Sequence, residues 1–253
     1  MIDRVIYESD ILLEVIDARM PNITRNKKVE NKIRRKRKFL IIVINKSDLI
    51  TRKMRMNFLQ RFKSKELIFV SCKDRMGIST LKEMIFKLAK KRRHWNYTKV
   101  GVIGYPNTGK SSVINALVGR SVVKTSPIPG LTRGIQWIRG EGNIMFLDTP
   151  GVIPLDEKDE TEQALMSVID PNKLVNSDLA AIRIIQLFLD YNKSSLEKFY
   201  GVKIETVDSF EILLEIGRRK NFLKKGGKVE EVRAALTIIR DWQKGDLLMK
   251  TLE

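Results

Sequence analysis

The fold is decided by one stretch, Gly104-Tyr105-Pro106-Asn107-Thr108-Gly109-Lys110-Ser111, which matches the phosphate-loop pattern G-x-x-x-x-G-K-[ST]. The apolar run Val100-Gly101-Val102-Ile103 precedes it, and a helix is expected to open near Lys110. Backbone N–H groups beside Gly104 and Gly109 can then surround phosphate oxygens, while the helix N-terminus adds partial positive charge. The Rossmann alternative fails, because these glycines do not follow G-x-G-x-x-G.

The same loop supplies the predicted phosphate contacts. Lys110 is expected to reach the β- and γ-phosphates, and Ser111 to offer its hydroxyl to Mg²⁺. Asn107 has two interpretations: a ligand for K⁺ beside the phosphates, where a cation would neutralise developing charge, or a residue that suits a tight loop. The expected nucleotide contacts in this loop are Asn107, Thr108, Gly109, Lys110, Ser111 and Ser112.

Two further motifs follow the loop. Asp148-Thr149-Pro150-Gly151 ends the apolar run Ile144 to Leu147, where an Asp can hold Mg²⁺ through water and a glycine N–H can contact the γ-phosphate. Pro127-Ile128-Pro129-Gly130-Leu131-Thr132 lies between them and is typical of a switch segment. We expect Mg²⁺ to be held by Ser111, Thr132 and Asp148. The expected catalytic residues are Lys110, Thr132, Gly151 and Asn107.

A base-reading motif, Asn45-Lys46-Ser47-Asp48, follows the strongest apolar run, Phe39 to Ile44. The carboxylate of Asp48 can accept hydrogen bonds from guanine N1–H and the 2-amino group, which adenine lacks. Sites that depend on such bonds discriminate by about 10⁴–10⁵. Asn45 can bond the base edge and brace the loop, and the stem of Lys46 can lie along the base. An exposed polar turn is the alternative reading of this tetrapeptide.

A second strand-end motif supports the base site. Ser71-Cys72-Lys73 matches the loop whose backbone N–H meets guanine O6, so Ser71, Cys72 and Lys73 join the predicted nucleotide contacts. Cys72 is then a small loop residue rather than a reactive thiol. As the single cysteine it excludes an internal disulfide.

The order of the motifs is the reverse of the usual one, since the base motifs precede the phosphate loop. Nearly continuous apolar runs indicate parallel strands covered on both faces. Residues 135–139 alternate more and suit an edge strand, with a hairpin around residues 140–143. We therefore expect an α/β fold: a circularly permuted P-loop GTPase domain with a mostly parallel sheet. The runs are Ile11–Ile16, Phe39–Ile44, Leu67–Val70, Val100–Ile103 and Ile144–Leu147.

After about residue 158 the apolar spacing becomes helical. We expect residues 1–158 to form the GTPase domain and residues 159–253 a small all-α C-terminal domain that binds RNA or the ribosome. Nucleotide state could then pass directly from the Gly151 segment into the helices. The apolar sets are Leu179, Ile182 and Ile185, then Phe210, Leu213, Leu214 and Gly217, then Val229, Val232, Leu236 and Ile239.

Charge points to a polyanionic partner. The 253 residues include 48 Lys and Arg against 30 Asp and Glu, a net charge of +18 with a pI of about 10.0. A Lys/Glu-rich stabilised surface would be balanced, so nucleic acid is favoured. His94 is the single histidine, which excludes the usual zinc sites and His-based triads. No apolar run reaches membrane-span length. We expect a cytoplasmic monomer without a membrane partner.

Basic segments carry the RNA prediction. One crowds residues 25–38 and another residues 90–93, where the following Trp95 could stack on unpaired bases or pack under the sheet. A third lies near residues 218–228. The predicted RNA contacts are Arg34, Arg35, Arg37, Lys38, Arg92, Arg93, Arg218 and Arg219.

The motif order, the Asp17-Ala18-Arg19-Met20-Pro21 signature after the first strand and the helical tail resemble the YlqF/RbgA family of circularly permuted GTPases. The resemblance covers nearly the whole chain. It implies a factor in large ribosomal subunit assembly that binds ribosomal RNA. Because the chain begins close to its first strand, we expect it to lack the N-terminal segments of some relatives.

Hydrolysis is expected to be slow. Val152 stands where many GTPases have a Gln that orients the attacking water, and the family resemblance implies the same hydrophobic replacement. Arg133 could donate charge in cis, or it could be a surface or RNA contact. A GTP-responsive RNA-binding module with negligible turnover, acting on another RNA or ribonucleoprotein, therefore stays open as the alternative function.

Overall fold

The computed structural model describes residues 2–62, 66–91, 97–119, 136–148 and 158–249, without the side chains of Arg61, Gln136 and Asp148. Its contacts divide the chain into two units. One contains Met1–Asp48 and Phe58–Leu155, and the other Leu49–Asn57 and Asp156–Glu253. The predicted boundary at residue 158 stays a prediction, because residues 149–157 lie outside the described part.

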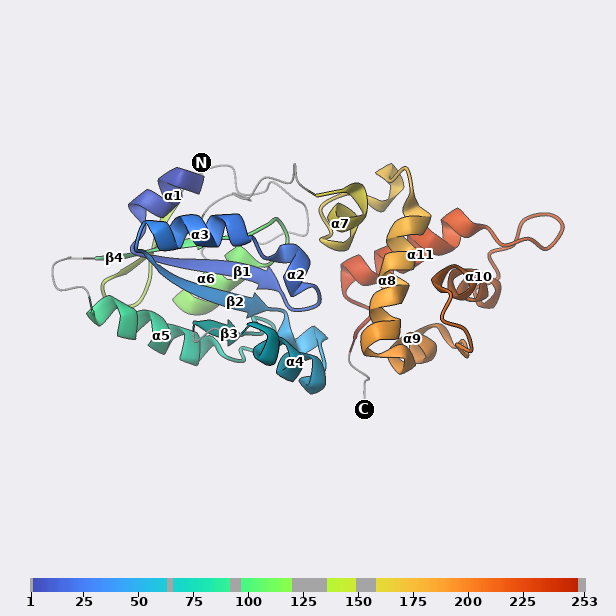
Figure 1. Cartoon of the computed structure of the whole chain (residues 1–253), viewed down its shortest axis with the longest axis horizontal. Helices are drawn as coiled ribbons and strands as arrows, with labels where there is room; N and C mark the ends of the chain where they lie inside the picture. Colours follow the sequence, from blue (N-terminus) through green and yellow to red (C-terminus); the bar gives the residue numbers. More distant parts are fainter. Residues whose placement is uncertain (1, 63–65, 92–96, 120–135, 149–157, 250–253) are drawn as a thin grey trace. The chain divides into compact units, whose positions relative to one another are not determined.

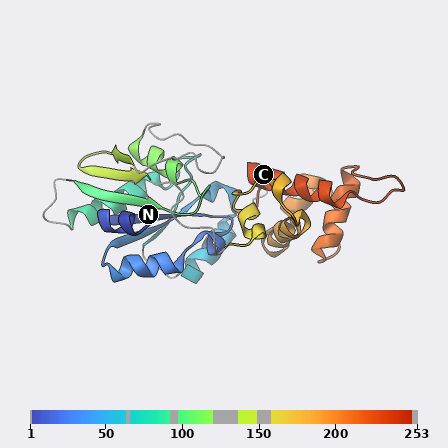
Figure 2. The ribbon, with the colours of Figure 1, turned by 90° about the horizontal axis from the view of Figure 1, so that it is seen from above.

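The first unit is built on a six-stranded sheet in the order β3-β2-β1-β4-β6-β5. All neighbouring pairs are parallel except β5 with β6, which form the predicted hairpin at one edge of the sheet (Figure 2). The predicted α/β class and mostly parallel sheet are confirmed. The strands are β1 (Ile11–Asp17), β2 (Phe39–Asn45), β3 (Leu67–Phe69), β4 (Thr98–Ile103), β5 (Gln136–Arg139) and β6 (Ile144–Asp148).

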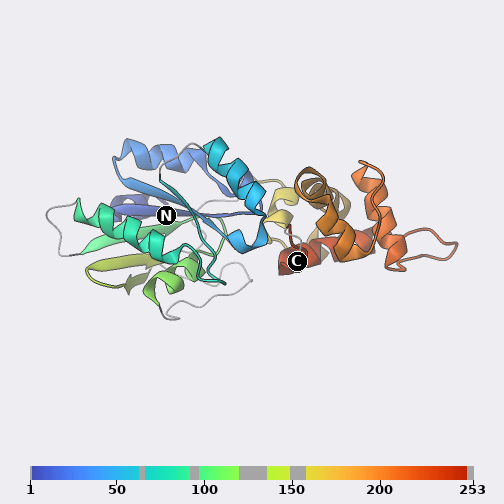
Figure 3. The same cartoon turned by 90° about the horizontal axis from the view of Figure 1, so that it is seen from below.

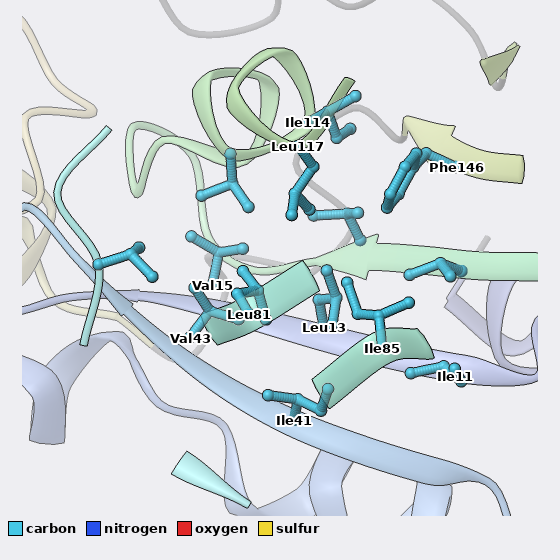
Figure 4. Close-up of a cluster of buried hydrophobic side chains, with 14 of the residues drawn as sticks. Ile11, Leu13, Val15, Ile41, Val43, Leu81, Ile85, Ile114, Leu117 and Phe146 are labelled. Carbon is cyan, nitrogen blue, oxygen red and sulfur yellow. The ribbon is translucent and has the colours of Figure 1, made fainter. Parts of the chain in front are cut away.

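Helices cover both faces of this sheet, which explains the continuous apolar runs. Leu13 and Val15 of β1 pack into a core with α5 and α6 (Figure 4). Figure 3 shows both helices beside the sheet. Leu12 packs in a second core with residues of α1 and α3. Figure 1 shows these two helices on one side of the sheet. The helical segments of residues 2–118 are α1 (Ile2–Glu8), α2 (Pro21–Thr24), α3 (Lys27–Arg35), the 3₁₀ turn η1 (Ser47–Leu49), α4 (Arg52–Phe62), α5 (Ile78–Lys90) and α6 (Lys110–Val118).

Strand order places the motifs. β4, which leads into the phosphate loop, lies between β1 and β6. β2, which leads into Asn45–Asp48, lies on the far side of β1. Because these strands are parallel, their carboxyl ends meet at one edge of the sheet, where ligands bind in open α/β folds.

The residues after 158 are helical, as predicted. The longest pair, α8 and α11, share a core in which the rings of Phe188 and Trp242 meet edge to face, with centroids 6.2 Å apart. The Trp242 indole N–H donates to the Leu165 carbonyl at 2.9 Å. The segments are α7 (Glu160–Leu165), η2 (Pro171–Lys173), α8 (Ser177–Tyr191), α9 (Lys193–Tyr200), α10 (Ser209–Arg219) and α11 (Glu231–Lys244).

Two predicted helix faces need correction. The helical spacing groups Leu179 and Val232 with the apolar residues of their helices, but they are 51% and 64% exposed. The buried stripes of α8 and α11 run one or two positions away, because the face that is covered depends on the neighbouring helix. Val229 precedes α11 and pairs instead with Leu223. No described helix is both long enough and apolar enough to cross a bilayer.

Candidate guanine-nucleotide site

The phosphate loop depends on its glycines. Gly104 has φ +149°, and an added Cβ would lie 2.4 Å from the Val15 carbonyl oxygen of the neighbouring strand. Gly109 has φ +91°, and its Cβ would lie 2.2 Å from Asn45 Nδ2. Asn107 also has a positive φ, +59°. A side chain at either glycine would therefore both strain the backbone and displace a neighbour.

Lys110 opens α6 at the end of this loop and is buried. Its Nζ donates to the Tyr105 carbonyl at 2.9 Å, and the Thr108 hydroxyl donates to the same oxygen at 3.0 Å. The Lys110 ammonium therefore folds back onto the start of the phosphate loop, close to the N-terminus of α6, where anions are stabilised.

The base-reading motif touches the phosphate loop. Asn45, at the end of β2, donates from Nδ2 to the Thr108 carbonyl at 3.0 Å. Asn45 Oδ1 is buried, and no described residue bonds to it. This bond joins the two motifs directly, although Asn45 and Thr108 are 63 positions apart.

The rest of the base motif is anchored to the next strand. The Ser47 N–H donates to the Val70 carbonyl at 3.1 Å, which holds Asp48 beside the Ser71–Lys73 loop. Burial, and secondly the charge of Asp48, raise the pKa of Cys72 to about 12. The thiol is therefore protonated at neutral pH, which supports its interpretation as a small loop residue. The Ser71 hydroxyl accepts from the Asp74 N–H at 3.1 Å and stabilises the turn.

A buried ion cluster lies at the end of β1, beside the base motif. Asp17 pairs with Asn45 in the β1–β2 register and is 2% exposed. Its Oδ2 accepts from Lys46 Nζ at 2.7 Å and from Arg19 Nη2 at 2.9 Å. These two cations keep the pKa of Asp17 low against the opposing effect of burial. The sequence identified Asp17–Pro21 only as a family signature, because no spacing rule connects Asp17 to Lys46.

A second network runs behind the phosphate loop, and it too was missed from the sequence. Glu14, in the middle of β1, is fully buried, and its Oε1 accepts from the Asn26 N–H at 2.8 Å. Asn26 Nδ2 donates to the Tyr105 hydroxyl at 3.1 Å. Its Oδ1 accepts from the Val29 N–H at 3.0 Å and caps α3. The phosphate loop is thereby connected to the basic helix.

Part of the predicted γ-phosphate and metal site falls outside the described residues. The segments that are not described contain Thr132, Arg133, Gly151 and Val152. For Asp148, only the backbone is described, at the end of β6. Ser111 lies half-buried in the first turn of α6. The Ser111 hydroxyl and the carboxylate of Asp148, the last residue of β6, are both oxygen ligands, the type that Mg²⁺ prefers, so the residues fit this ion.

The predicted RNA residues differ in their surroundings. Arg35 and Arg37 are exposed, whereas Arg34 Nη2 lies 3.4 Å from the buried Glu30 carboxylate. Lys38 Nζ donates to the carbonyls of Tyr7 at 3.1 Å and Ser9 at 2.7 Å.

Lys38 therefore stabilises the C-terminal end of α1, as cations do at helix ends. In α10, Arg218 pairs with Glu215 at 3.0 Å and Arg219 is exposed. Arg92 and Arg93 lie outside the described residues.

Comparisons with known proteins agree with this arrangement. A family model described as "50S ribosome-binding GTPase" matches residues 99–224. An uncharacterized GTP-binding protein of Methanocaldococcus jannaschii is 40% identical over 250 residues, which cover 98% of this chain and 65% of that protein.

Nucleolar GTP-binding protein 2 of Pneumocystis carinii and nuclear/nucleolar GTPase 2 of Arabidopsis thaliana are 33% and 34% identical, each over 96% of this chain. The chain spans only 51% and 42% of their lengths.

Solved structures share the fold. GNP-bound YlqF from T. maritima matches with a TM-score of 0.60 and 22% identity, covering 100% of this chain and 95% of that one. A GDP-bound YlqF structure matches with a TM-score of 0.62 and 24% identity, covering 98% and 95%.

Fold, motif order and matches together define the class as a circularly permuted P-loop GTPase. Within that class, the chain is similar in sequence to the archaeal GTP-binding protein and to the nucleolar GTP-binding protein 2 relatives, and similar in fold to YlqF. The resemblance inferred from the motif order is confirmed.

Proposed function

We propose that the protein binds and hydrolyses GTP and acts as an RNA-binding switch in assembly of the large ribosomal subunit. The observation that carries the nucleotide part is the hydrogen bond from Asn45 to the Thr108 carbonyl. It brings a guanine-type motif and a phosphate loop into one site, at the sheet edge where open α/β folds bind ligands.

Each part of the site has a distinct task. Asp48 would accept from guanine N1–H and the 2-amino group and thereby exclude adenine. Lys110 would exchange its bond with the Tyr105 carbonyl for the β- and γ-phosphates, with Thr108 and Ser112 beside it. Ser111, Thr132 and Asp148 would hold Mg²⁺, which when bound neutralises phosphate charge.

Turnover by the isolated protein is proposed to be low, because Val152 cannot orient water as a Gln does. Asn107 would hold K⁺ at the phosphates. Exchange of K⁺ for Na⁺ should then lower the rate in the parent protein but not in Asn107→Ala. An equal cation response in both proteins would remove this role.

The RNA and ribosome part rests on charge and on what the relatives are called. The net charge of +18 requires counterions or a polyanion, and the matching family model is described as ribosome-binding. Two of the relatives are named as nuclear or nucleolar, whereas for this chain we retain a cytoplasmic monomer as the proposal. Sedimentation and cell fractionation test that assignment.

The nucleotide assignment is tested by Asp48→Asn. The amide offers a donor where the carboxylate only accepted, so GTP affinity should fall and xanthosine triphosphate affinity should rise. ATP measured on the parent protein serves as the control for base selection. Equal affinity of the parent protein for ATP and GTP would reject the base site.

The cellular role is tested by co-sedimentation with large ribosomal subunits, with a GTP analogue or GDP bound. Stronger association in one nucleotide state, with hydrolysis stimulated by subunits, supports an assembly switch. Nucleotide-dependent binding to another RNA, without stimulated hydrolysis, favours the alternative: a GTP-responsive RNA-binding module with negligible turnover.

A further inference from the structure

We propose that Asp17 and Arg19 are positioning residues for guanine-nucleotide binding, which hold Lys46 so that its stem is ready for the base. The inference rests on the proposed function, because it assigns a task to residues beside the base motif. It gives the Asp17-Ala18-Arg19 stretch, which the nucleotide contacts do not use, a specific role.

The geometry of the carboxylate leaves little freedom. Asp17 Oδ1 accepts from the Arg19 backbone N–H at 3.0 Å and from Arg19 Nε at 3.1 Å. Its Oδ2 accepts from Arg19 Nη2 at 2.9 Å and from Lys46 Nζ at 2.7 Å. The Asp17 N–H donates to the Thr24 hydroxyl at 3.0 Å, which ties the backbone beneath it. Arg19 thus fixes the carboxylate, and the carboxylate fixes the lysine.

Lys46 is a residue that needs such fixing. A free lysine side chain has about 2 kcal/mol of rotamer entropy to lose when it is ordered. The Lys46 backbone, directly after β2, is in the left-handed region at φ +61°, which residues other than glycine rarely adopt. The Ala18 N–H donates to the Asn45 carbonyl at 2.9 Å. The segment that contains Asp17 and the segment that contains Lys46 are therefore also joined through their backbones.

Charge balance is part of the arrangement. The charged groups that act on the Lys46 ammonium are Asp17, Arg19 and Asp48, so the cluster has two cations and two carboxylates. Burial lowers the pKa of Lys46, and the Arg19 charge lowers it further, while the two carboxylates oppose this. Removal of Asp17 would therefore both free the ammonium and make it easier to deprotonate.

The test uses the full chain and the affinity for GDP at pH 7, where guanine N1–H is fully protonated. Lys46→Met keeps most of the stem without the charge, and Asp17→Asn removes only the anchor. We expect Asp17→Asn to weaken GDP binding about tenfold. In a Lys46→Met background, Asp17→Asn should change affinity by less than about twofold. Tenfold corresponds to about 1.4 kcal/mol.

Two companions make the outcome decisive. Asp10→Asn is the matched control, because Asp10 is also buried and lies at the opposite end of β1, where it accepts from the Lys99 N–H at 2.9 Å. It should alter stability but not GDP affinity. If the buried Arg19 charge prevents Asp17→Asn from folding, Asp17→Asn/Arg19→Met removes both charges and should show the same loss of GDP affinity.

Three results would overturn the inference. One is a loss of affinity from Asp17→Asn that is the same size in the Lys46→Met background. Another is normal GDP affinity with lower stability, which would make the cluster purely structural. The third is a parent protein that binds no guanine nucleotide, which rejects the proposed function and this inference together. Only this third result is observed in the parent protein, whereas the first two are observed in the variants. Failure of the proposed function is therefore distinguishable from failure of this inference.

Discussion

At the scale of single residues, Glu14 is the least expected side chain of the sheet. It is fully buried between β1 and α3, and its Oε2 has no hydrogen-bond partner among the described residues. Burial, then the negative charge of Glu30, raise the pKa of Glu14 to about 8, although the Asn26 N–H opposes the shift. The carboxyl is therefore mostly protonated at neutral pH.

This shift predicts a pH-dependent stability. The ordinary pKa is 4.5, so between about pH 4.5 and 8 the folded protein keeps a proton that the unfolded chain has released. Glu14 therefore lowers the free energy of unfolding as pH rises through that window, by at most about 1.4 kcal/mol per pH unit. Glu14→Gln removes the titration.

The measurement is urea unfolding of parent and Glu14→Gln proteins at pH 5 and pH 8. The variant should gain stability relative to the parent at the higher pH. Glu141→Gln, at a side chain 70% exposed, is the control and should show little pH-dependent difference. A constant difference between Glu14→Gln and the parent across the range would contradict the shifted pKa.

Gly109 gives the second residue-scale prediction. Gly109→Ala would place a Cβ 2.2 Å from Asn45 Nδ2 and break the bond to the Thr108 carbonyl. Gly119 has a similar φ, +79°, but nothing lies within 4 Å of its Cβ, so Gly119→Ala has the backbone strain without the clash. Both should lose about 1–3 kcal/mol of stability.

Only Gly109→Ala should also weaken GDP binding, which calorimetry can measure. Equal nucleotide affinity in the two glycine variants would show that the Asn45 brace is dispensable.

Some of these residues could be found from sequence and others could not. Gly109, Lys110 and Asp48 belong to short motifs whose spacing is local. Nothing in the sequence indicates that Glu14 is buried, because a single carboxylate in an apolar strand is normally expected at the edge of the sheet, where it can reach solvent. Its burial depends on α3, which the chain brings over it from residues 27–35.

At the scale of elements, α3 is attached to the phosphate loop at its first turn. Asn26 caps the helix through the Val29 N–H and bonds the Tyr105 hydroxyl through its amide. Asn26→Ala should therefore cost about 1–2 kcal/mol of stability, the usual range for a lost cap with little else changed. Asn26→Ser should restore part of the cap but not the bond to Tyr105.

Unfolding and nucleotide affinity together separate these two contributions. Asp208→Ala is the control, since Asp208 caps α10 through the Phe210 N–H at 2.8 Å and is remote in sequence from the loop. It should lower stability without changing GDP affinity. If Asn26→Ala also leaves GDP affinity unchanged, the contact with Tyr105 has no influence on the loop.

Elements were predictable where one physical rule dominated. The strands could be located because both sheet faces are covered, which requires continuous apolar runs, and because these runs are too short for helices. The buried faces of α8 and α11 were harder, because residues such as Leu179 satisfy a helical period without facing the neighbour. The period indicates a helix, whereas the packing partner selects the face.

At the scale of the whole molecule, the excess positive charge predicts salt-dependent RNA binding. The logarithm of affinity should fall linearly with the logarithm of salt concentration, by roughly 0.7 to 0.9 per phosphate contact. Arg35 and Arg37 are exposed, so replacing both with Gln should reduce the slope by roughly 1.4 to 1.8 without altering GDP affinity.

The control replaces Lys193 and Lys203, which lie outside the predicted RNA residues, and should leave the slope nearly unchanged. Filter binding to ribosomal RNA over a salt series gives both slopes. Equal slopes in the two double variants would place RNA elsewhere on the protein.

Permutation also predicts how the two units communicate. The helical residues follow the Asp148–Gly151 motif directly in the chain, so nucleotide state should alter RNA affinity by about 1–3 kcal/mol. Insertion of six Gly/Ser residues after Asp156 should reduce the difference in RNA affinity between the two nucleotide states. The variant should still bind GTP and GDP with normal affinity. Coupling that is unchanged by the insertion would exclude transmission along this connection.

The strand order has a consequence for how the protein is made. β1, β2 and β3 are consecutive in the chain and adjacent in the sheet, so a ribosome synthesising this protein completes the base-reading half before residue 104 exists. Until β4 emerges, one edge of β1 has no partner strand, and the nascent chain cannot use nucleotide to stabilise itself. We expect GTP to assist folding only late in translation, once α6 has closed the loop.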